Sequence, residues 1–365
     1  MAKSYEVYIG TYTEPIKFGT GEIMNGKGEG IHFAYFDAES GVLDIQKEAT
    51  PSVNPSYLVL SADKRYLYCV NEMKKYQDMP GGSVSAFAIE GPGKLRHINT
   101  QPTRGEDPCH INIDSNSRHV FAANFMTGST CMFPVNEAGG LEADSAFFQH
   151  EGSGPDKLRQ AGPHAHAVVL TPGERYALVP DLGIDKIMVY AYDGVGGVLS
   201  PSHEIALKPG DGPRHGVFHP EKQTLFYVIN ELSLHVAVFE FDHVNGMGKL
   251  VQEVPIVKAS GPDSIGADIQ IAPNGKFLYA SVRGNDIIAA YQIDQVTGLL
   301  SDPAVFSSGG KTPRSFAVSP DNKFLVAGNQ DTDNIVIFKI DQNTGALEKL
   351  SEQFAPTPVC IKFVD

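Results

Sequence analysis

A glycine–leucine phrase closes an apolar segment seven times along the 365 residues of this chain. The seven copies are Gly41-Val42-Leu43, Gly93-Lys94-Leu95, Gly140-Leu141, Gly197-Val198-Leu199, Gly248-Lys249-Leu250, Gly298-Leu299 and Gly345-Ala346-Leu347. Their glycines lie 52, 47, 57, 51, 50 and 47 residues apart. A repeat of about 50 residues is typical of solenoids and β-propellers, in which each copy builds one supersecondary unit. The repeat therefore restricts the chain to one of these two architectures.

Each copy contains predicted strands and no helical period. The phrase follows an alternating segment rich in β-branched and aromatic residues, such as 335–341 or 236–242, which predicts a strand. A second strand is predicted upstream, at 66–71, 119–124, 176–181, 225–230, 277–282 and 324–329. A first strand is introduced by a proline, at Pro55, Pro108, Pro163, Pro213, Pro313 and Pro358. With a fourth strand after the glycine–leucine phrase, each repeat forms one propeller blade.

The two ends of the chain are complementary. The chain begins at a second-strand segment, 6–11, and ends with a lone first strand, 358–363. The C-terminal strand can therefore complete the first blade, which leaves no open edge for aggregation. We predict an all-β, seven-bladed propeller of four-stranded blades, closed by both termini and forming a single domain over residues 1–365.

The composition excludes several classes of function. The chain has 29 Lys and Arg against 43 Asp and Glu, so a net charge of −14 opposes non-specific binding to nucleic acid. It has no apolar run that could span a bilayer and no signal-peptide pattern, which predicts a cytoplasmic protein without a membrane partner. The cysteines lack CxxC spacing and are expected to be buried small hydrophobes; they are Cys69, Cys109, Cys131 and Cys360. We expect a monomer or a weak homodimer.

Functional residues should appear where aligned blade positions depart from the repeat. In the first strand, which lines the channel, one position carries Ser56, Cys109, His166, Arg214, Ala267 and Arg314 in blades two to seven. Blade four also has two extra residues around His164 and His166, whose alternation predicts that both imidazoles point the same way. His110 and His215 directly follow the column position, and we expect their side chains to face away from the side on which the column residues lie.

A second column follows the end of the second strand. The strand itself ends in Asn71, Asn124, Asp181, Asn230, Val282 and Asn329, and recurring Asn indicates local backbone capping. The next position carries Glu72, Phe125, Leu182, Glu231, Arg283 and Gln330. Glu231 and Arg283 belong to adjacent blades, beside Arg214 and His166. The candidate site is therefore His164, His166, Arg214, Glu231 and Arg283, with Asp181 and Arg314 nearby.

This set suits acid–base chemistry on a small anionic molecule. Imidazole and carboxylate groups exchange protons near neutral pH, and guanidinium groups bind carboxylate or phosphate and stabilise oxyanions. His164, His166 and Glu231 could ligate a divalent ion, but the nearby arginines oppose a cation, so we predict neither metal nor cofactor. The glycine-rich segment 18–30 joins two strands and opens no helix, which indicates a flexible rim loop rather than a phosphate cradle.

Six phrases give the chain a resemblance to a known family. They are Tyr8-Ile9-Gly10-Thr11-Tyr12-Thr13, Asn54-Pro55-Ser56-Tyr57-Leu58, Gly162-Pro163-His164-Ala165-His166, Val179-Pro180-Asp181-Leu182-Gly183, Gly212-Pro213-Arg214-His215-Gly216 and Asn230-Glu231-Leu232. The chain resembles the seven-bladed lactonases, which join propeller-type 6-phosphogluconolactonases with 3-carboxy-cis,cis-muconate lactonising enzymes. The resemblance implies a metal-free site of one histidine, two arginines and a glutamate. These fall on His166 or His164, Arg214, Arg283 and Glu231, with catalytic roles, while His164, Asp181 and Arg314 are expected to bind substrate.

Three hypotheses for the function remain open at this point. The first is hydrolysis of 6-phospho-D-glucono-1,5-lactone in the pentose phosphate pathway, with Glu231 or His166 as the base. The second is reversible lactonisation of a carboxylated muconate, in which the arginines bind carboxylates. The third is a non-catalytic propeller that binds a partner on one face. The basic, imidazole-rich column disfavours the third, and the tight blades favour the hydrolase by analogy with the family.

Overall fold

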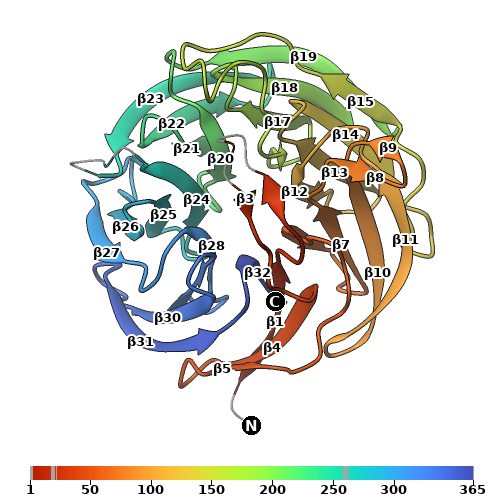
Figure 1. Cartoon of the computed structure of the whole chain (residues 1–365). Coiled ribbons are helices and arrows are strands. Elements are labelled where there is room, and N and C mark those ends of the chain that lie inside the picture. The colour runs from red at the N-terminus through yellow and green to blue at the C-terminus, as the bar shows by residue number, and fades with distance from the viewer. Residues whose placement is uncertain (1–2, 18–20, 22, 258–260, 262, 365) are drawn as a thin grey trace.

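The strands form a ring of seven four-stranded sheets around a central axis (Figure 1). This computed structural model describes residues 3–17, 21, 23–257, 261 and 263–364, and it assigns no helix within these ranges. The predicted all-β propeller with four-stranded blades is confirmed. None of the described residues belongs to a helix with the length and hydrophobicity needed to cross a membrane.

Six blades each run from an inner strand to an outer strand in chain order. Blades two to four contain β6 (Tyr57–Leu60), β7 (Tyr66–Asn71), β10 (Ser83–Gly91) and β11 (Lys94–Pro102); β12 (Pro108–Ile113), β13 (His119–Asn124), β14 (Ser129–Pro134) and β15 (Ala146–Gln149); and β16 (Val169–Leu170), β17 (Tyr176–Asp181), β18 (Lys186–Asp193) and β19 (Val198–Ala206). Blades five to seven contain β20 (Pro213–Phe218), β21 (Leu225–Asn230), β22 (His235–Asp242) and β23 (Met247–Pro255); β24 (Ile265–Ile271), β25 (Phe277–Arg283), β26 (Ile287–Gln292) and β27 (Ala304–Ser307); and β28 (Pro313–Val318), β29 (Phe324–Asn329), β30 (Asn334–Ile340) and β31 (Leu347–Phe354).

The first blade contains both ends of the chain. Its strand order is β32 (Pro358–Val364), β1 (Ser4–Thr11), β4 (Ile31–Asp37) and β5 (Leu43–Ile45). The antiparallel register of β32 and β1 runs from Val364 opposite Glu6 to Pro358 opposite Thr11. The predicted closure is therefore confirmed, and the C-terminal strand is the innermost strand of the first blade.

The recurring glycine has two physical roles. Gly41, Gly197, Gly298 and Gly345 have φ angles of 65–75°, which glycine adopts without steric cost. They also approach the preceding blade closely, because a Cβ on Gly345 would lie 2.5 Å from the Phe277 ring. In blades three and five the turn glycine is Gly139 or Gly246, one or two residues before the glycine of the sequence phrase.

A tyrosine strengthens several of these contacts between blades. The hydroxyl groups of Tyr68, Tyr227 and Tyr279 donate hydrogen bonds to the carbonyl oxygens of Gly139, Gly298 and Gly345 at 3.1, 2.6 and 3.1 Å. In each case the tyrosine belongs to one blade and the glycine to the next. We call this pairing of a turn glycine with the preceding blade the glycine joint.

The hydrophobic core lies between the blades rather than within one layer. Seven clusters of buried residues among the described positions each combine side chains from two neighbouring blades, including a cluster that joins blades seven and one. Two short hairpins lie outside the blades: β2 (Ile16–Lys17) with β3 (Ile23–Met24), and β8 (Lys75–Tyr76) with β9 (Met79–Pro80). Of the predicted rim loop, Phe18, Gly19, Thr20 and Glu22 lie outside the described residues.

Candidate active site

A pocket of about 370 Å³ lies where the second strands of several blades end. Its described lining comes from six blades and from the β3 hairpin, and its polar members are Glu72, Cys109, Arg159, His166, Glu231, Asp263, Arg283, Thr312, Arg314, Gln330 and Asp331. This volume lies in the range of small-ligand sites. Four residues predicted from the sequence therefore meet in one pocket: His166, Glu231, Arg283 and Arg314.

Glu231 is the centre of the pocket's electrostatics. Its carboxylate is almost completely buried and accepts hydrogen bonds from three guanidinium groups. Arg214 Nε donates to Oε2 at 2.9 Å and Arg283 donates to the same oxygen at 2.8 Å, while Arg159 pairs with Oε1. Three positive charges on one carboxylate leave an excess positive charge, which suits an anionic ligand.

The arginines keep Glu231 ionised. Burial alone would raise the pKa of Glu231, but the charges of Arg283, Arg159 and Arg214 together hold it well below its usual value. Burial lowers the pKa of Arg283 to about 9, against the opposing effect of Glu231. Arg283 therefore remains charged at neutral pH. Arg283 lines the pocket, and its buried Nε has no hydrogen-bond acceptor among the described residues.

His166 is held as a neutral imidazole. Burial lowers its pKa well below the usual value, and the charges of Arg214, His215 and Arg314 lower it further. Its Nδ1 lies 3.5 Å from the Sγ of Cys109. Burial raises the pKa of Cys109, as it does for the other three cysteines, so the group beside His166 is a thiol. All four cysteines are free and buried, as the sequence predicted.

His110 and His215 are absent from the described pocket lining, as expected for side chains that face away from it, but they are not separated from His166. The His215 ring lies 5.2 Å from His166 and 5.4 Å from His110, in edge-to-face contacts. The reason is a β-bulge after Pro213 and another after Pro108, which interrupt the alternation of side chains along these strands. The three imidazoles therefore form a buried cluster at the inner strands, completed by the Asp268 carboxylate 3.0 Å from His215 Nδ1.

His164 and Asp181, which the sequence predicted to bind substrate, make their contacts outside the pocket lining. The His164 ring stacks on Phe125 at 4.6 Å, and its Nδ1 lies 2.9 Å from the Phe125 carbonyl oxygen. Asp181 is fully buried, accepts hydrogen bonds from the backbone N–H groups of His164 and Gly183, and contacts His150. Neither is among the described residues that line the pocket. The surrounding contacts position the backbone that carries His166.

Arg214 and Arg314 occupy different depths of the site. Arg214 is 1% exposed and bonds to Glu231 and the Ala267 carbonyl oxygen, so it supports the pocket from behind. Arg314 lines the pocket and lies 3.6 Å from the Glu72 carboxylate. The Tyr12 hydroxyl donates to the same carboxylate at 2.9 Å. Glu72 and Arg314 thus form a second, charge-balanced polar group in the pocket.

Seven polar lining residues were not predicted from the sequence: Glu72, Cys109, Arg159, Asp263, Thr312, Gln330 and Asp331. Glu72 occupies the same aligned column as Glu231, so the alignment contained a signal for it. Cys109 also occupies an aligned column, but its residue type indicated only burial. Arg159 lies in the connection between β15 and β16, where no aligned blade position exists.

The metal-ligand set considered from the sequence does not assemble. His164 binds the Phe125 carbonyl oxygen, whereas His166 lies beside Cys109 and Glu231 is occupied by three arginines. Within the described part of the chain, no group of three or more His, Cys, Asp or Glu side chains is placed to hold a metal ion.

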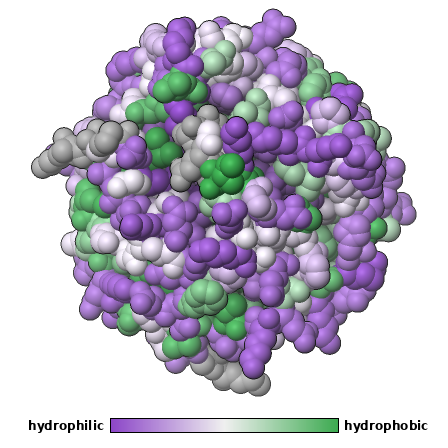
Figure 2. Space-filling view, in the orientation of Figure 1, coloured by the Kyte–Doolittle hydropathy of each residue, from purple (hydrophilic) through white to green (hydrophobic). Residues whose placement is uncertain are grey.

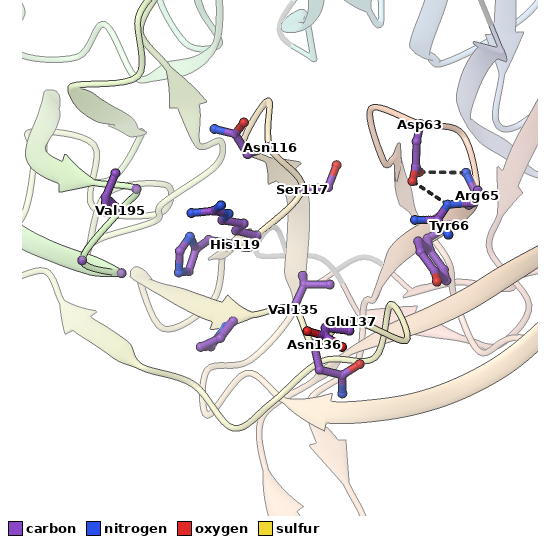
Figure 3. A pocket seen from close by; sticks show the side chains of 15 residues that line it. Asp63, Arg65, Tyr66, Asn116, Ser117, His119, Val135, Asn136, Glu137 and Val195 are labelled. Carbon is purple, nitrogen blue, oxygen red and sulfur yellow. Dashed lines mark hydrogen bonds and ion pairs between the residues drawn. The ribbon is translucent and has the colours of Figure 1, made fainter.

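A larger hollow of about 730 Å³ lies at the other end of the second strands, next to Tyr66 and His119 (Figure 3). Its Asp63 and Arg65 pair with each other at 2.6 Å, and both are substantially exposed. It contains none of the residues predicted for catalysis. The buried charges and the neutral imidazole make the smaller pocket the candidate active site.

Comparison with known proteins identifies the family. The family model described as a lactonase with a 7-bladed β-propeller matches residues 6–363. The chain belongs to this family. The predictions of a lactonase, of a hydrolase acting on carboxylic esters and of a small lactone as substrate class are thereby confirmed.

Relatives of this lactonase are similar over most or all of its length. The 6-phosphogluconolactonase of Bacillus subtilis strain 168 is 36% identical over 363 residues, covering 99% of this chain and 98% of the relative. The 6-phosphogluconolactonase of Formosa agariphila is 36% identical over 299 residues, covering 80% and 82%. The solved structure of a periplasmic gluconolactonase from Pseudomonas aeruginosa has a TM-score of 0.90 at 28% identity, covering 100% of this lactonase and 99% of that chain.

The buried histidines are expected to make stability depend on pH. Burial, and then the charge of Arg214, lowers the pKa of His215 from 6.5 to about 4. As the pH falls, His215 is therefore protonated in the unfolded chain before it is protonated in the folded chain. The contribution of neutral, buried His215 to the stability of the fold is complete above pH 6.5 and is lost as the pH falls toward 4. Lowering the pH from 7.5 to 5 should reduce the free energy of unfolding by on the order of 2 kcal/mol through His215 alone.

A His215→Asn variant isolates this contribution. Its free energy of unfolding should fall less steeply than that of the wild type between pH 7.5 and 5, as measured by denaturant titration at both pH values. Burial raises the pKa of Asp107 to about 7, which acts in the opposite direction but is common to both proteins and cancels. Identical pH slopes for the two proteins would contradict the buried, neutral state of His215.

Proposed function

We propose that this lactonase hydrolyses 6-phospho-D-glucono-1,5-lactone to 6-phosphogluconate, a step of the oxidative pentose phosphate pathway. The observation that carries the proposal is the buried Glu231 carboxylate held by three arginines in the same pocket as a neutral imidazole. The relatives named 6-phosphogluconolactonase support the same substrate. The three guanidinium groups gathered on the single Glu231 carboxylate give a chain of net charge −14 a local place to bind an anionic substrate.

In the proposed reaction, His166 is the general base. A neutral imidazole can accept the proton of a water molecule as the water oxygen attacks the lactone carbonyl carbon. The carbonyl oxygen becomes an oxyanion, which the guanidinium group of Arg283 stabilises from the pocket lining. Breaking the ring C–O bond then produces an alkoxide, to which the imidazolium returns the proton. Water has been added across the ester bond, and His166 is neutral again.

Glu231 orients the arginines and takes no proton in this scheme. Both of its oxygens already accept hydrogen bonds from guanidinium groups, which compete with a proton for them. Its negative charge fixes Arg283 in the geometry that the oxyanion requires. Arg314 and Glu72 provide a donor and an acceptor for the sugar hydroxyl groups. His164 and Asp181 contribute by holding the segment that carries His166.

Location, domain organisation, oligomeric state and partners complete the proposed function. We propose a cytoplasmic protein whose residues 1–365 act as a single domain, as a monomer or weak homodimer, without nucleic-acid or membrane partners. The hydrophobic side chains on the face in Figure 2 form small, separate patches among hydrophilic ones. Because large contiguous apolar patches mark many protein-binding surfaces, this face favours the enzyme over a partner-binding scaffold.

A substrate comparison tests the proposed reaction. Purified protein is incubated with 6-phospho-D-glucono-1,5-lactone and, separately, with the lactone of a carboxylated muconate, and the spontaneous reaction is subtracted. We expect fast, protein-dependent hydrolysis of the sugar lactone alone. Reaction of the muconate lactone alone would support the cycloisomerase, and no reaction of either would support the partner-binding propeller.

The hydrolysis is expected to continue without a divalent ion. Arg283, Arg214 and Arg159 already place positive charge around Glu231, and they oppose a cation at the same position. After dialysis against EDTA, the rate should remain within about twofold of the untreated rate. Loss of activity in EDTA, restored by stoichiometric zinc or manganese, would overturn this expectation.

A further inference from the structure

The connection that enters blade four is much longer than the corresponding connections elsewhere. Residues 150–168 separate β15 from β16, whereas residues 103–107 separate β11 from β12 and residues 207–212 separate β19 from β20. The inner strand of blade four is also reduced to Val169–Leu170 and one bridge between Ala165 and Asp181. This connection brings Arg159 into the pocket.

The long connection is anchored at Gln160. This side chain is fully buried, and its Nε2 donates to the Leu182 carbonyl oxygen at 2.8 Å and to Asp185 Oδ1 at 2.7 Å. Asp185 in turn accepts hydrogen bonds from the N–H groups of Gly210 and Gly212, at the entry to blade five. The connection is therefore fastened to blade four and, through Asp185, to the entry of blade five.

A tight turn sets the direction of Arg159. The Asp156 carboxylate accepts hydrogen bonds from the N–H groups of Leu158 and Arg159 at 2.9 and 3.1 Å, and the Asp156 carbonyl oxygen accepts from Gln160 N at 2.7 Å. In this turn Leu158 is 86% exposed, while the adjacent Arg159 points inward, with its side chain only 15% exposed. A hydrophobic residue outside and a charged residue inside indicate that the turn is built to present the guanidinium.

Arg159 differs from the other two arginines around Glu231. Arg214 is buried and divides its donors between Glu231 and the Ala267 carbonyl oxygen, so it does not reach the pocket. Arg283 bonds to Glu231 and the Gly266 carbonyl oxygen. Arg159 lines the pocket and holds the other carboxylate oxygen, Oε1. A guanidinium has five donors, so Arg159 can keep this pair and still bind a second anion.

We propose that Arg159 binds the phosphate group of a phosphorylated sugar lactone and sets the preference for phosphorylated over unphosphorylated substrates. A phosphate monoester carries a charge of about −1.5 to −2 at pH 7, which matches the excess of two positive charges around Glu231. Arg283 serves the reacting carbonyl, and Arg159 serves the far end of the substrate. The inference rests on the proposed lactone hydrolysis and adds a residue and a substrate feature to it.

The test compares two lactones that differ only in the phosphate. For 6-phospho-D-glucono-1,5-lactone, Arg159→Ala should lower kcat/KM by roughly 10- to 100-fold, mainly through KM, as expected for a lost charge-assisted hydrogen bond. For D-glucono-1,5-lactone the loss should be at least about tenfold smaller, and Arg159→Lys should restore part of the phosphate preference. Arg65→Ala, which removes an exposed arginine from the hollow at the other end of the blades, is the matched control and should match the wild type.

Other outcomes separate the inference from the proposed function. An equal loss for both lactones would overturn the phosphate role and assign Arg159 to the reaction itself, and no loss for either would also overturn it. Calorimetric binding of 6-phosphogluconate and of gluconate provides a readout that needs no turnover. If the wild type hydrolyses neither lactone but binds 6-phosphogluconate through Arg159, the proposed function fails and the phosphate site stands. If Arg159→Ala binds 6-phosphogluconate as tightly as the wild type does, the phosphate site fails.

Discussion

Glu231→Gln is expected to lower lactone hydrolysis by roughly 100-fold or more, and Arg283→Ala by a similar factor. The amide of Gln has nearly the shape of the carboxylate but lacks its charge, so the three guanidinium groups repel one another without compensation. Arg283→Ala removes the only pocket-lining guanidinium whose buried Nε has no acceptor among the described residues. Rates are measured at saturating lactone, so that the loss is read in kcat.

The same experiment includes the histidines and a control for folding. His166→Ala should behave as Glu231→Gln does if His166 is the base, whereas His164→Ala should have a smaller effect because the His164 ring stacks on Phe125 outside the pocket lining. Thermal unfolding should show that each variant remains folded, since aligned positions in other blades carry Phe125, Leu182 and Gln330 in place of Glu231. Wild-type activity in both Glu231→Gln and Arg283→Ala would place the reaction elsewhere and favour a partner-binding propeller.

Deletion of residues 356–365 is expected to abolish the cooperative fold. Val359, Cys360 and Ile361 of β32 are almost completely buried, and the strand pairs with β1 along its length. Burial of an aliphatic side chain contributes about 1.5–3 kcal/mol and each hydrogen bond about 1 kcal/mol, so the strand contributes on the order of 10 kcal/mol. This is comparable with the whole stability of a typical domain, about 5–15 kcal/mol.

Circular dichroism and thermal melts of the truncated chain provide the measurement. A peptide of residues 356–365 added in trans is the matched rescue, because it restores the same strand without covalent linkage. The expected result is a broad or absent transition that the peptide sharpens. A truncated protein that melts at the wild-type temperature would show that the ring does not depend on its closing strand.

The sequence predicted the ring well because its signals are local. The second strands of blades two to seven were predicted almost to the residue, since each begins near a turn and all but β25, which ends at Arg283, end at a buried Asn or Asp. Asn71, Asn124 and Asn329 do bond to nearby side chains or carbonyl groups, as their recurrence suggested. The closure followed from the same logic, because a missing first strand at one end has to be supplied by the other.

The site could be predicted only in part. Aligned columns identified Glu231, Arg283, His166 and Arg314, because these residues replace positions that every blade shares. Side-chain direction was less predictable, since it assumes regular alternation, and residues 163–168 of blade four form no continuous strand. Arg159 could not be found in this way, because it lies in a connection much longer than those of the other blades, where no aligned position exists.

The glycine joints and the pocket lie at opposite ends of the second strands. Tyr66, Tyr176 and Phe277 begin these strands and pack against the turn glycines, while Asn71, Asn230 and Arg283 end them beside the pocket. Residues that hold neighbouring blades together are thus spatially separate from residues that select a ligand. Substitutions on the pocket side can alter specificity at little cost in stability, which relaxes the usual conflict between activity and stability. A ring organised in this way is suited to the evolution of new substrate preferences, since its framework can stay constant while one face diversifies.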